Sequence, residues 1–275
     1  MKLKIVGSGG MYPIPSPFCK CKICDEAREK RGLFERCEPS IYVVDIKLLI
    51  DTPEDIAQAC DKGKVYDVDY LSISHKDPDH VRGIRNVVES RFDWIKGEVT
   101  KPIKFFALPE VIDGINQREG NTLDFYADIL KIIEVTSADS ITIDNIKITM
   151  VNNEAKTGDI AFYVLEEGDK KVVYACCNTK PFKDNEVYRD TDILIIGMVS
   201  DDGILKDGTR LCDVPIKDEI FTIDEIHNLK KQYNIKKVIV THIDDIWGKS
   251  YEEYKEIEKS LDGIEFAYDG MEIEV

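Results

Sequence analysis

The sequence contains no long apolar run and has a deficit of basic residues. No segment of the 275 residues approaches the roughly 18 consecutive apolar residues of a membrane-spanning helix. Lys and Arg number 37 against 53 Asp and Glu, which gives a formal net charge of −16. Such a field repels polyanions and removes the electrostatic term behind most non-specific nucleic-acid binding. We therefore expect a soluble cytoplasmic protein that binds neither membranes nor nucleic acid.

The hydrophobic and cysteine contents narrow the class further. With 43% hydrophobic residues the chain can bury a full core, and layered α/β proteins of this length are often one domain, although two are possible. We expect a single domain over residues 1–275. In a cytosolic protein the 8 cysteines are more often metal ligands, reactive thiols or small core residues than disulfide partners.

Short β-branched runs alternate with amphipathic segments along the chain. Early strands follow one another directly and later ones alternate with helices, which predicts two mixed sheets covered by helices. The predicted strands are residues 2–6, 41–50, 69–74, 103–107, 146–151, 160–165, 171–177, 192–197 and 236–241. The predicted helices are residues 22–31, 53–61, 80–89, 109–117, 122–131, 222–233 and 250–260.

One helix start and one long loop stand next to each other near the end of the chain. Thr222 and Glu225 form a capping-box pattern, which predicts where the helix 222–233 begins. The preceding segment 198–221 is long and polar. It is either a flap over an active site or an insertion.

Histidine is scarce, with only 4 in the chain, yet two of them share one heptapeptide, SHKDPDH, directly after the apolar run DYLSIS. A loop at a strand's end is where such scaffolds usually place chemistry. His75, Asp77, Asp79 and His80 have spacings at which a turn points side chains toward one Zn²⁺, Mn²⁺ or Fe ion. The alternative is a polar turn before a helix, with Asp79 as its N-cap.

His242 strengthens the metal hypothesis because it ends a second strand-like run, KKVIVT. Two strand ends that each deliver a His or an Asp are typical of a coordination shell assembled across a sheet. The remaining histidine, His227, lies inside the amphipathic helix 222–233, where we expect an ordinary solvent-facing residue.

A second metal candidate is the trio Cys19, Cys21 and Cys24 in a Pro-rich loop that leads into a helix. Three thiolates this close in sequence can wrap one Zn²⁺. Residues 19–24 are therefore predicted to form a structural zinc loop within the domain, with a fourth ligand from elsewhere, for which Cys37 is one candidate. The alternative is a reduced thiol cluster near solvent.

These motifs resemble those of the metallo-β-lactamase superfamily. ISHKDPDHVRGI resembles its His-x-His-x-Asp-His signature, LLIDT the preceding strand and turn, and VIVTHI its last ligand strand. The N-terminal GSGGMYPIPSPFCKCKICDEA and the C-terminal FAYDGMEIEV resemble the branch containing the cyclic phosphodiesterase of the carbon–phosphorus lyase pathway and protein B of pyrroloquinoline quinone synthesis. The resemblance covers the chain end to end and is weakest at about 85–145.

The resemblance implies a four-layer αβ/βα sandwich with metals at the edges of both sheets. It also implies hydrolysis of a phosphodiester, thioester or amide by a hydroxide held between two metals, which lower its pKa and steady the developing charge. Asp51 would orient a ligand histidine, and Asp245, where the phosphodiesterase has a histidine, would complete the structural zinc site.

The departures from the signature fall on the first metal site. Asp77 stands where the signature has its second His, Asn153 where the next ligand His is expected, and Cys177 or Asn178 where the bridging Asp is expected. The set His75, Asp77 and Asn153 is a poor Zn²⁺ cage because an amide oxygen is a weak neutral donor.

The second metal site matches the signature more closely than the first. Asp79, His80 and His242 remain, and Cys177 adds a thiolate, a set that tetrahedral Zn²⁺ accepts. One tightly held active-site metal is therefore favoured over two. The alternative for Cys176 and Cys177 is that both are small residues at the end of a buried strand.

Two functions remain open from the sequence. The first is a metal-dependent hydrolase of a small phosphodiester or cyclic phosphate, acting through a metal-bound hydroxide, with Asp79 catalytic and with His75 and Asp77 as a weaker second site or as proton carriers. This hydrolase would contain one structural zinc and one or two zinc ions at the active site, where Mn or Fe could replace zinc. The protein could also form a homodimer. The second is a non-catalytic metal-binding scaffold that holds a biosynthetic intermediate.

Overall fold

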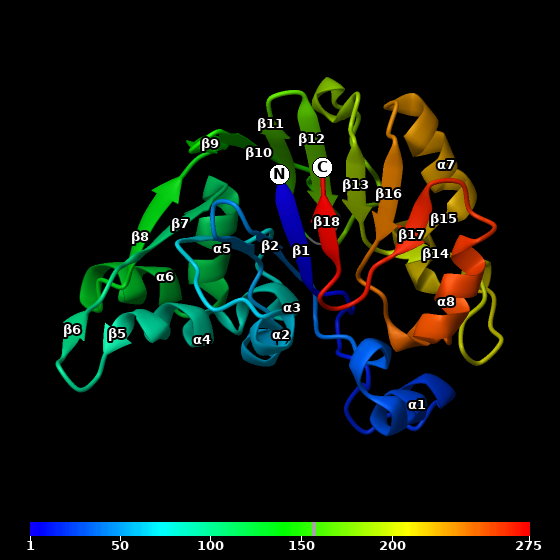
Figure 1. The fold of residues 1–275 in the computed structure, drawn as a ribbon, viewed down its shortest axis with the longest axis horizontal. Coiled ribbons are helices and arrows are strands. Elements are labelled where there is room, and N and C mark those ends of the chain that lie inside the picture. The colour runs from blue at the N-terminus through cyan, green and yellow to red at the C-terminus, as the bar shows by residue number, and fades with distance from the viewer. Residues whose placement is uncertain (156–157) are drawn as a thin grey trace.

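The computed structural model describes residues 1–155 and 158–275 and contains two seven-stranded mixed sheets. The first sheet has the order β18-β1-β2-β3-β4-β7-β8 and the second the order β17-β16-β13-β12-β11-β10-β9. Helices α2, α4 and α5 lie beside the first sheet, and α7 and α8 flank the second on the opposite side of the molecule (Figure 1). This is the predicted four-layer sandwich of helix, sheet, sheet and helix.

Each sheet joins an antiparallel part to a parallel part. In the first, β1, β2 and β3 pair antiparallel, and β3, β4, β7 and β8 pair parallel. The strands of this sheet are β1 (Lys2–Gly7), β2 (Ser40–Val43), β3 (Leu48–Ile50), β4 (Tyr70–Ser72), β7 (Ile103–Ala107), β8 (Ile133–Ser137) and β18 (Glu272–Glu274).

The second sheet repeats this plan, with β9 to β12 as an antiparallel meander and β12, β13, β16 and β17 parallel. Parallel neighbours need crossover connections, which here carry helices that cover the sheet. Its strands are β9 (Ser140–Ile143), β10 (Ile146–Asn152), β11 (Ala161–Glu167), β12 (Lys170–Ala175), β13 (Ile193–Ile196), β16 (Lys237–Val240) and β17 (Ile264–Phe266).

The helices are short, and each is too short or too polar to cross a membrane among the described residues. The capping box of α7 is confirmed, because the Thr222 side chain accepts a hydrogen bond from the Glu225 N–H and the Glu225 side chain accepts one from the Thr222 N–H. The α-helices are α1 (Lys22–Lys30), α2 (Ile56–Gly63), α3 (Pro78–Val81), α4 (Ile84–Val88), α5 (Pro109–Arg118), α6 (Thr122–Asp124), α7 (Ile223–Gln232) and α8 (Tyr251–Glu258).

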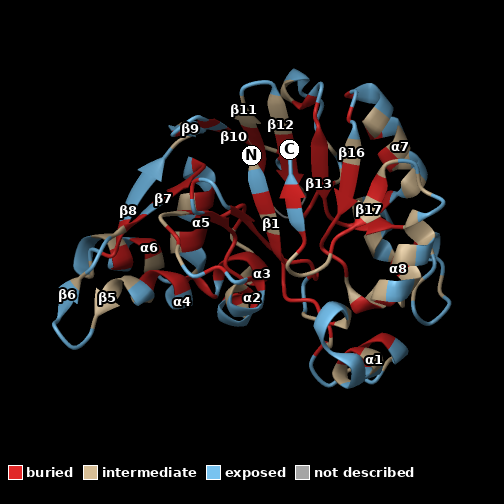
Figure 2. Ribbon diagram, in the orientation of Figure 1, coloured by how far each residue is buried: buried red, intermediate tan, exposed pale blue. Residues whose placement is uncertain are grey.

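One large hydrophobic cluster takes side chains from both sheets, and Phe105 and Tyr163 are among its largest fully buried members. The central strands are accordingly buried along most of their length (Figure 2). A second, small cluster of Ile14, Ile23 and Ala27 lies under α1, apart from the main core. The N-terminal loop therefore has little apolar burial of its own.

Two predicted elements are divided in the structure. The run 41–50 is a hairpin, β2 and β3, whose turn contains Lys47 at φ 51°. Its turn lacks Gly and Pro, which is why the pattern looked continuous. The predicted helix 80–89 is split into α3 and α4 around Gly83, where an added Cβ would lie 1.9 Å from the Pro53 carbonyl oxygen.

Several short elements were not predicted. The strands β8, β9, β17 and β18 were missed because each offers only three to five residues, too few for a reliable alternation. A hairpin of β5 (Phe92–Asp93) and β6 (Glu98–Val99) also lies in the weakly patterned middle. The segment 198–221 contains β14 (Val199–Ser200), which pairs with β15 (Phe221–Thr222), and two 3-10 helices.

Candidate metal centre

The candidate centre lies where strands of both sheets end. Asp51 follows β3, Cys177 follows β12, and His242 follows β16, while Asp79 and His80 sit on α3 behind β4. Left-handed backbone occurs at these strand ends, in a region that non-glycine residues rarely occupy and that turns the chain sharply. The residues concerned are Asp51 (φ 69°), Asn178 (φ 47°), Met198 (φ 58°) and His242 (φ 54°).

The two predicted strand-end motifs meet at Asp79. Its Oδ2 lies 3.3 Å from His80 Nε2 and 3.6 Å from His242 Nε2. All three side chains are buried, and the rings of His80 and His242 stack with centroids 5.9 Å apart. A carboxylate and two imidazoles at these separations have the arrangement of donors that share one cation.

Cys177 and His75 lie near the same histidine, His80. With His80 they form a buried group whose ligand atoms lie within 4.8 Å of one another. Burial raises the pKa of the Cys177 thiol, but the adjacent imidazoles, His242 above all, outweigh it and hold that pKa well below its usual range. Cys177 is therefore poised as a thiolate, the form that binds metal.

Unpartnered nitrogens show that these residues fit a metal. The Nε2 atoms of His80 and His242 are buried without a hydrogen-bond partner among the described residues. A buried polar atom left without a partner is costly, so the arrangement calls for a group that accepts several lone pairs at once. A divalent cation of the zinc type does this.

Asp51 fixes the orientation of His80. Its Oδ2 lies 2.9 Å from His80 Nδ1 and accepts from the Ser74 hydroxyl at 2.9 Å, and its Oδ1 accepts the Ser74 N–H at 2.7 Å. The thiol of Cys176 also reaches Asp51 Oδ2, at 3.5 Å. An Nδ1–H that donates to Asp51 leaves the lone pair of His80 on Nε2, facing the centre.

Two predicted ligands have other partners. Asp77 accepts from Arg118 Nη1 at 2.8 Å and lies 3.4 Å from His75 Nε2. The Asn153 amide donates to the carbonyls of Asn178 and Pro181, at 3.2 and 3.0 Å, and its oxygen accepts a backbone N–H. Asp77 is therefore paired with the end of α5, and Asn153 is bonded to the backbone of the loop 178–183.

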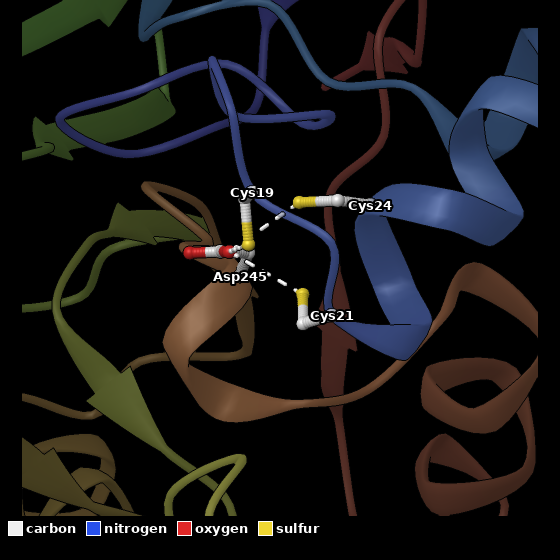
Figure 3. Close-up of side chains that lie close together, drawn as sticks. All are labelled: Cys19, Cys21, Cys24 and Asp245. Atoms are coloured by element: carbon white, nitrogen blue, oxygen red, sulfur yellow. Dashed lines mark hydrogen bonds between the residues drawn. The ribbon is translucent and has the colours of Figure 1, made fainter.

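The cysteine trio comes together as a second cluster. Cys19, Cys21 and Cys24 surround Asp245, whose Oδ2 accepts their thiols at 3.1, 3.5 and 3.3 Å (Figure 3). All four ligand atoms lie within 4.8 Å of one another, whereas Cys37, the rival fourth ligand, is buried elsewhere and is not in any such group among the described residues. Three sulfurs and one oxygen suit a structural zinc.

Other residues at the two sites gave no sequence signal. Arg118 lies on α5, 41 positions after Asp77, and no spacing rule connects them. Asp244 Oδ2 lies 3.6 Å from His242 Nδ1, and its place two residues after a ligand histidine was the only available hint. His227 is half-buried on α7 and belongs to neither metal cluster.

The fold and the clustered histidines define a metallo-β-lactamase-type protein, and the chain belongs to the beta-lactamase superfamily, whose domain profile matches residues 47–243. A comparison with curated proteins finds no match.

Solved structures resemble the whole chain. One is a diphosphatase from the PhnP family, with 20% identity, a TM-score of 0.74 and coverage of 100% of this chain and 97% of that one. Zn²⁺-bound PqqB from Methylobacterium extorquens has 18% identity, a TM-score of 0.75 and coverage of 100% of both chains. Unliganded yeast PDE1 has 13% identity, a TM-score of 0.61 and coverage of 100% and 99%. At these identities the likeness establishes the fold.

Proposed function

We propose that the protein is a metal-dependent hydrolase of a small phosphodiester or cyclic phosphate. The observation that carries the proposal is a pair of buried ligand groups that share His80, one with Asp79 and His242 and the other with His75 and Cys177, in which the Nε2 atoms of His80 and His242 have no hydrogen-bond partner among the described residues. The resemblance of the fold to a diphosphatase of the PhnP family supports the phosphate-containing substrate class.

These four residues would hold one metal of the zinc type. When bound, such an ion supplies a Lewis acid and lowers the pKa of water at the site. Asp79 would contribute a full negative charge: burial raises the pKa of its carboxyl, but His80 and His242 outweigh this and hold it well below its usual range. A set with a thiolate and two imidazoles favours Zn²⁺ over Mg²⁺ or Ca²⁺.

His75 is assigned the proton-carrying role. Burial lowers the pKa of its imidazole, but hydrogen bonding to Asp77 and Cys177 outweighs this and holds it above its usual value. Arg118 fixes Asp77 beside it. In the proposed reaction His75 would pass a proton to the departing alkoxide, a general-acid role that histidine fills at neutral pH.

Turnover of a bis-aryl phosphodiester by zinc-loaded protein tests the proposal. We expect metal-dependent hydrolysis that falls by at least about 100-fold in Asp79→Ala, since a lost ligand removes both metal and charge. Asp113→Ala, an exposed carboxylate on α5, is the matched control and should keep full activity. An absence of turnover with Zn²⁺, Mn²⁺ and Fe²⁺ alike would overturn the proposal.

A non-catalytic scaffold is the second candidate. The observation that favours it is the engagement of Asp77 and Asn153 by other groups, which leaves the first metal position of the superfamily signature incomplete. Zinc-loaded protein that binds an aryl phosphodiester with saturation, and releases it unchanged after prolonged incubation, would establish the scaffold in place of the hydrolase.

For the cysteine cluster we propose a structural zinc on Cys19, Cys21, Cys24 and Asp245. Burial raises the pKa of the Cys24 thiol to about 12, so a cation is needed to hold it as a thiolate. The metal would compensate for the small apolar cluster under α1, and would fasten the N-terminal loop to the segment that follows His242.

A further inference from the structure

A lysine from the long polar segment reaches the cysteine cluster. Lys206 Nζ lies 2.7 Å from Asp245 Oδ2 and 3.7 Å from Cys19 Sγ. The backbone of the same residue is also held, because its N–H donates to the Ile246 carbonyl at 2.7 Å. Lys206 thus connects the segment 198–221 to the proposed zinc ligands through both its main chain and its side chain.

The net charge of the zinc-loaded cluster explains why the positively charged Lys206 side chain lies beside it. Three thiolates and a carboxylate around a divalent ion leave an excess of roughly two negative charges. The Lys206 ammonium offsets part of that excess, and its side chain is only 33% exposed, so solvent screens the contact incompletely. With neutral thiols and no ion, the only negative partner would be Asp245. The attraction on Lys206 is therefore larger when the cluster holds a metal ion than when Asp245 is its one negative partner there.

A second lysine fastens the same loop without touching the cluster. Lys249 Nζ pairs with Asp201 at 3.2 Å and Asp202 at 3.0 Å. Between the two lysine contacts, Gly248 packs so closely that an added Cβ would lie 2.9 Å from Lys206 Cα. The residues 201–210 thus lie against 244–249, which continue directly from the ligand His242.

The fastened residues form part of a cavity. Gly203, Ile204 and Arg210 belong to the wall of a cavity of about 400 Å³. Its lining also includes Lys180 and Glu225, which pair at 2.7 Å, and Lys180 lies three positions after Cys177 in sequence. A displacement of the loop would therefore change the shape of this cavity.

We propose that Lys206 is the link through which a metal in the cysteine cluster holds residues 201–210 in place, and with them one wall of this cavity. The inference rests on the structural zinc proposed above and is independent of the catalytic centre. Through this link, the metal content of the cluster would control the conformation of the 198–221 segment. The long polar segment 198–221 would then be neither a simple insertion nor a free flap, because its position would depend on the metal.

Lys206→Met tests the link, with Lys249→Met as the matched control, because Lys249 holds the same loop from the facing segment 244–249. Both are studied in the Asp79→Ala background, so that the catalytic centre contributes no zinc. Transfer of zinc to a chromophoric chelator should be roughly three- to ten-fold faster in Lys206→Met and unchanged in Lys249→Met, because only Lys206 compensates the cluster's charge.

Hydrogen exchange of residues 201–210 supplies the second readout. In the parent protein, removal of zinc should raise exchange in this segment, whereas in Lys206→Met exchange should be high with or without zinc. In Lys249→Met exchange should be raised but still respond to zinc. Unchanged zinc transfer together with a retained zinc response in Lys206→Met would overturn the link.

Metal content shows separately whether the structural zinc site itself is wrong. If Cys21→Ser in the same background leaves the metal content unchanged, the cluster holds no zinc, and both the structural site and the Lys206 link are wrong. If Cys21→Ser removes the zinc but Lys206→Met behaves like the parent protein, the structural site stands and the link alone is wrong.

Discussion

At the residue scale, Cys177 would determine which metals the proposed centre accepts. Cys177 or Asn178 stands where the superfamily signature places a bridging carboxylate, and Cys177 as a ligand would replace a hard oxygen donor with a soft sulfur. Its neighbour Cys176 is also buried, and its thiol lies 3.5 Å from Asp51 Oδ2 and 3.9 Å from His80 Nδ1. We therefore propose different roles for the two adjacent thiols, Cys177 as a metal ligand and Cys176 as a neighbour of the carboxylate that orients His80.

Substitution of this pair separates the two roles. Cys177→Ala should weaken zinc binding at the centre by at least about 100-fold, because a charged ligand is lost. Cys176→Ala should change it by less than about ten-fold, because Asp51 keeps its contacts with Ser74 and His80. Competition with a zinc-buffering chelator measures both values. Equal effects in the two variants would show that Cys177 is not a ligand.

At the element scale, the centre depends on how closely the ends of β12 and β13 approach. Gly197 follows β13, and an added Cβ there would lie 1.6 Å from the Cys176 carbonyl oxygen and 2.7 Å from His242 Cβ. No side chain fits between these strand ends. The absence of a Cβ at Gly197 therefore lets the loops that carry Cys177 and His242 approach each other, as the proposed metal centre requires.

Gly197→Ala should accordingly destabilise the fold by about 3 kcal/mol or more, because the contact is with backbone and cannot relax by a rotamer change. Gly63→Ala is the matched control, since nothing lies closer than 3.8 Å to its added Cβ and Ala is the better helix former. Denaturant unfolding gives both free energies. A Gly197→Ala protein as stable as the control would show that the strand ends have room to separate.

Element by element, the sequence predicted what is locally encoded. The alternation of apolar runs gave the two mixed sheets, and polar residues placed just after strands indicated that Asp79, His80 and His242 would meet. The contacts of Asp77 and Asn153 were not predictable in this way. A residue type states what a side chain is able to bind, whereas packing of α5 and of the 178–183 loop decides what it binds here.

The hairpin within 41–50 and the helix break at Gly83 were not predicted for a related reason. The turn of the hairpin contains no Gly or Pro. The break at Gly83 depends on contact with Pro53, which is distant in sequence. Short edge strands such as β18 and β9 escaped because their pairing partners, and not their own composition, define them.

At the scale of the whole molecule, the excess of acidic residues extends into the interior. Glu38 is buried, and burial together with the nearby Asp55 raises the pKa of its carboxyl to about 8. A carboxyl whose folded pKa exceeds its unfolded value binds the proton more tightly in the folded state. Its contribution to stability is therefore complete below about pH 4.5 and is lost as the pH rises toward about 8.

Glu38→Gln should therefore flatten the pH dependence of stability. We expect the variant to be more stable than the parent by roughly 1–3 kcal/mol near pH 9, with a much smaller difference near pH 5, because the neutral amide has no charge to bury. Glu110→Gln, at an exposed position on α5, is the control and should run parallel to the parent. Urea unfolding at the two pH values measures the free energies of unfolding. If the difference in stability between Glu38→Gln and the parent were the same at both pH values, the raised pKa of Glu38 would be contradicted.

The metal content of three proteins tests most directly whether distant strand ends share one ion. Mass spectrometry of zinc-reconstituted protein should find about two zinc ions per chain in the parent, and about one in His242→Ala and in Cys21→Ser, with a different ion lost in each. His242→Ala that retains the parent's zinc content would contradict the centre formed by Asp79, His80, Cys177 and His242.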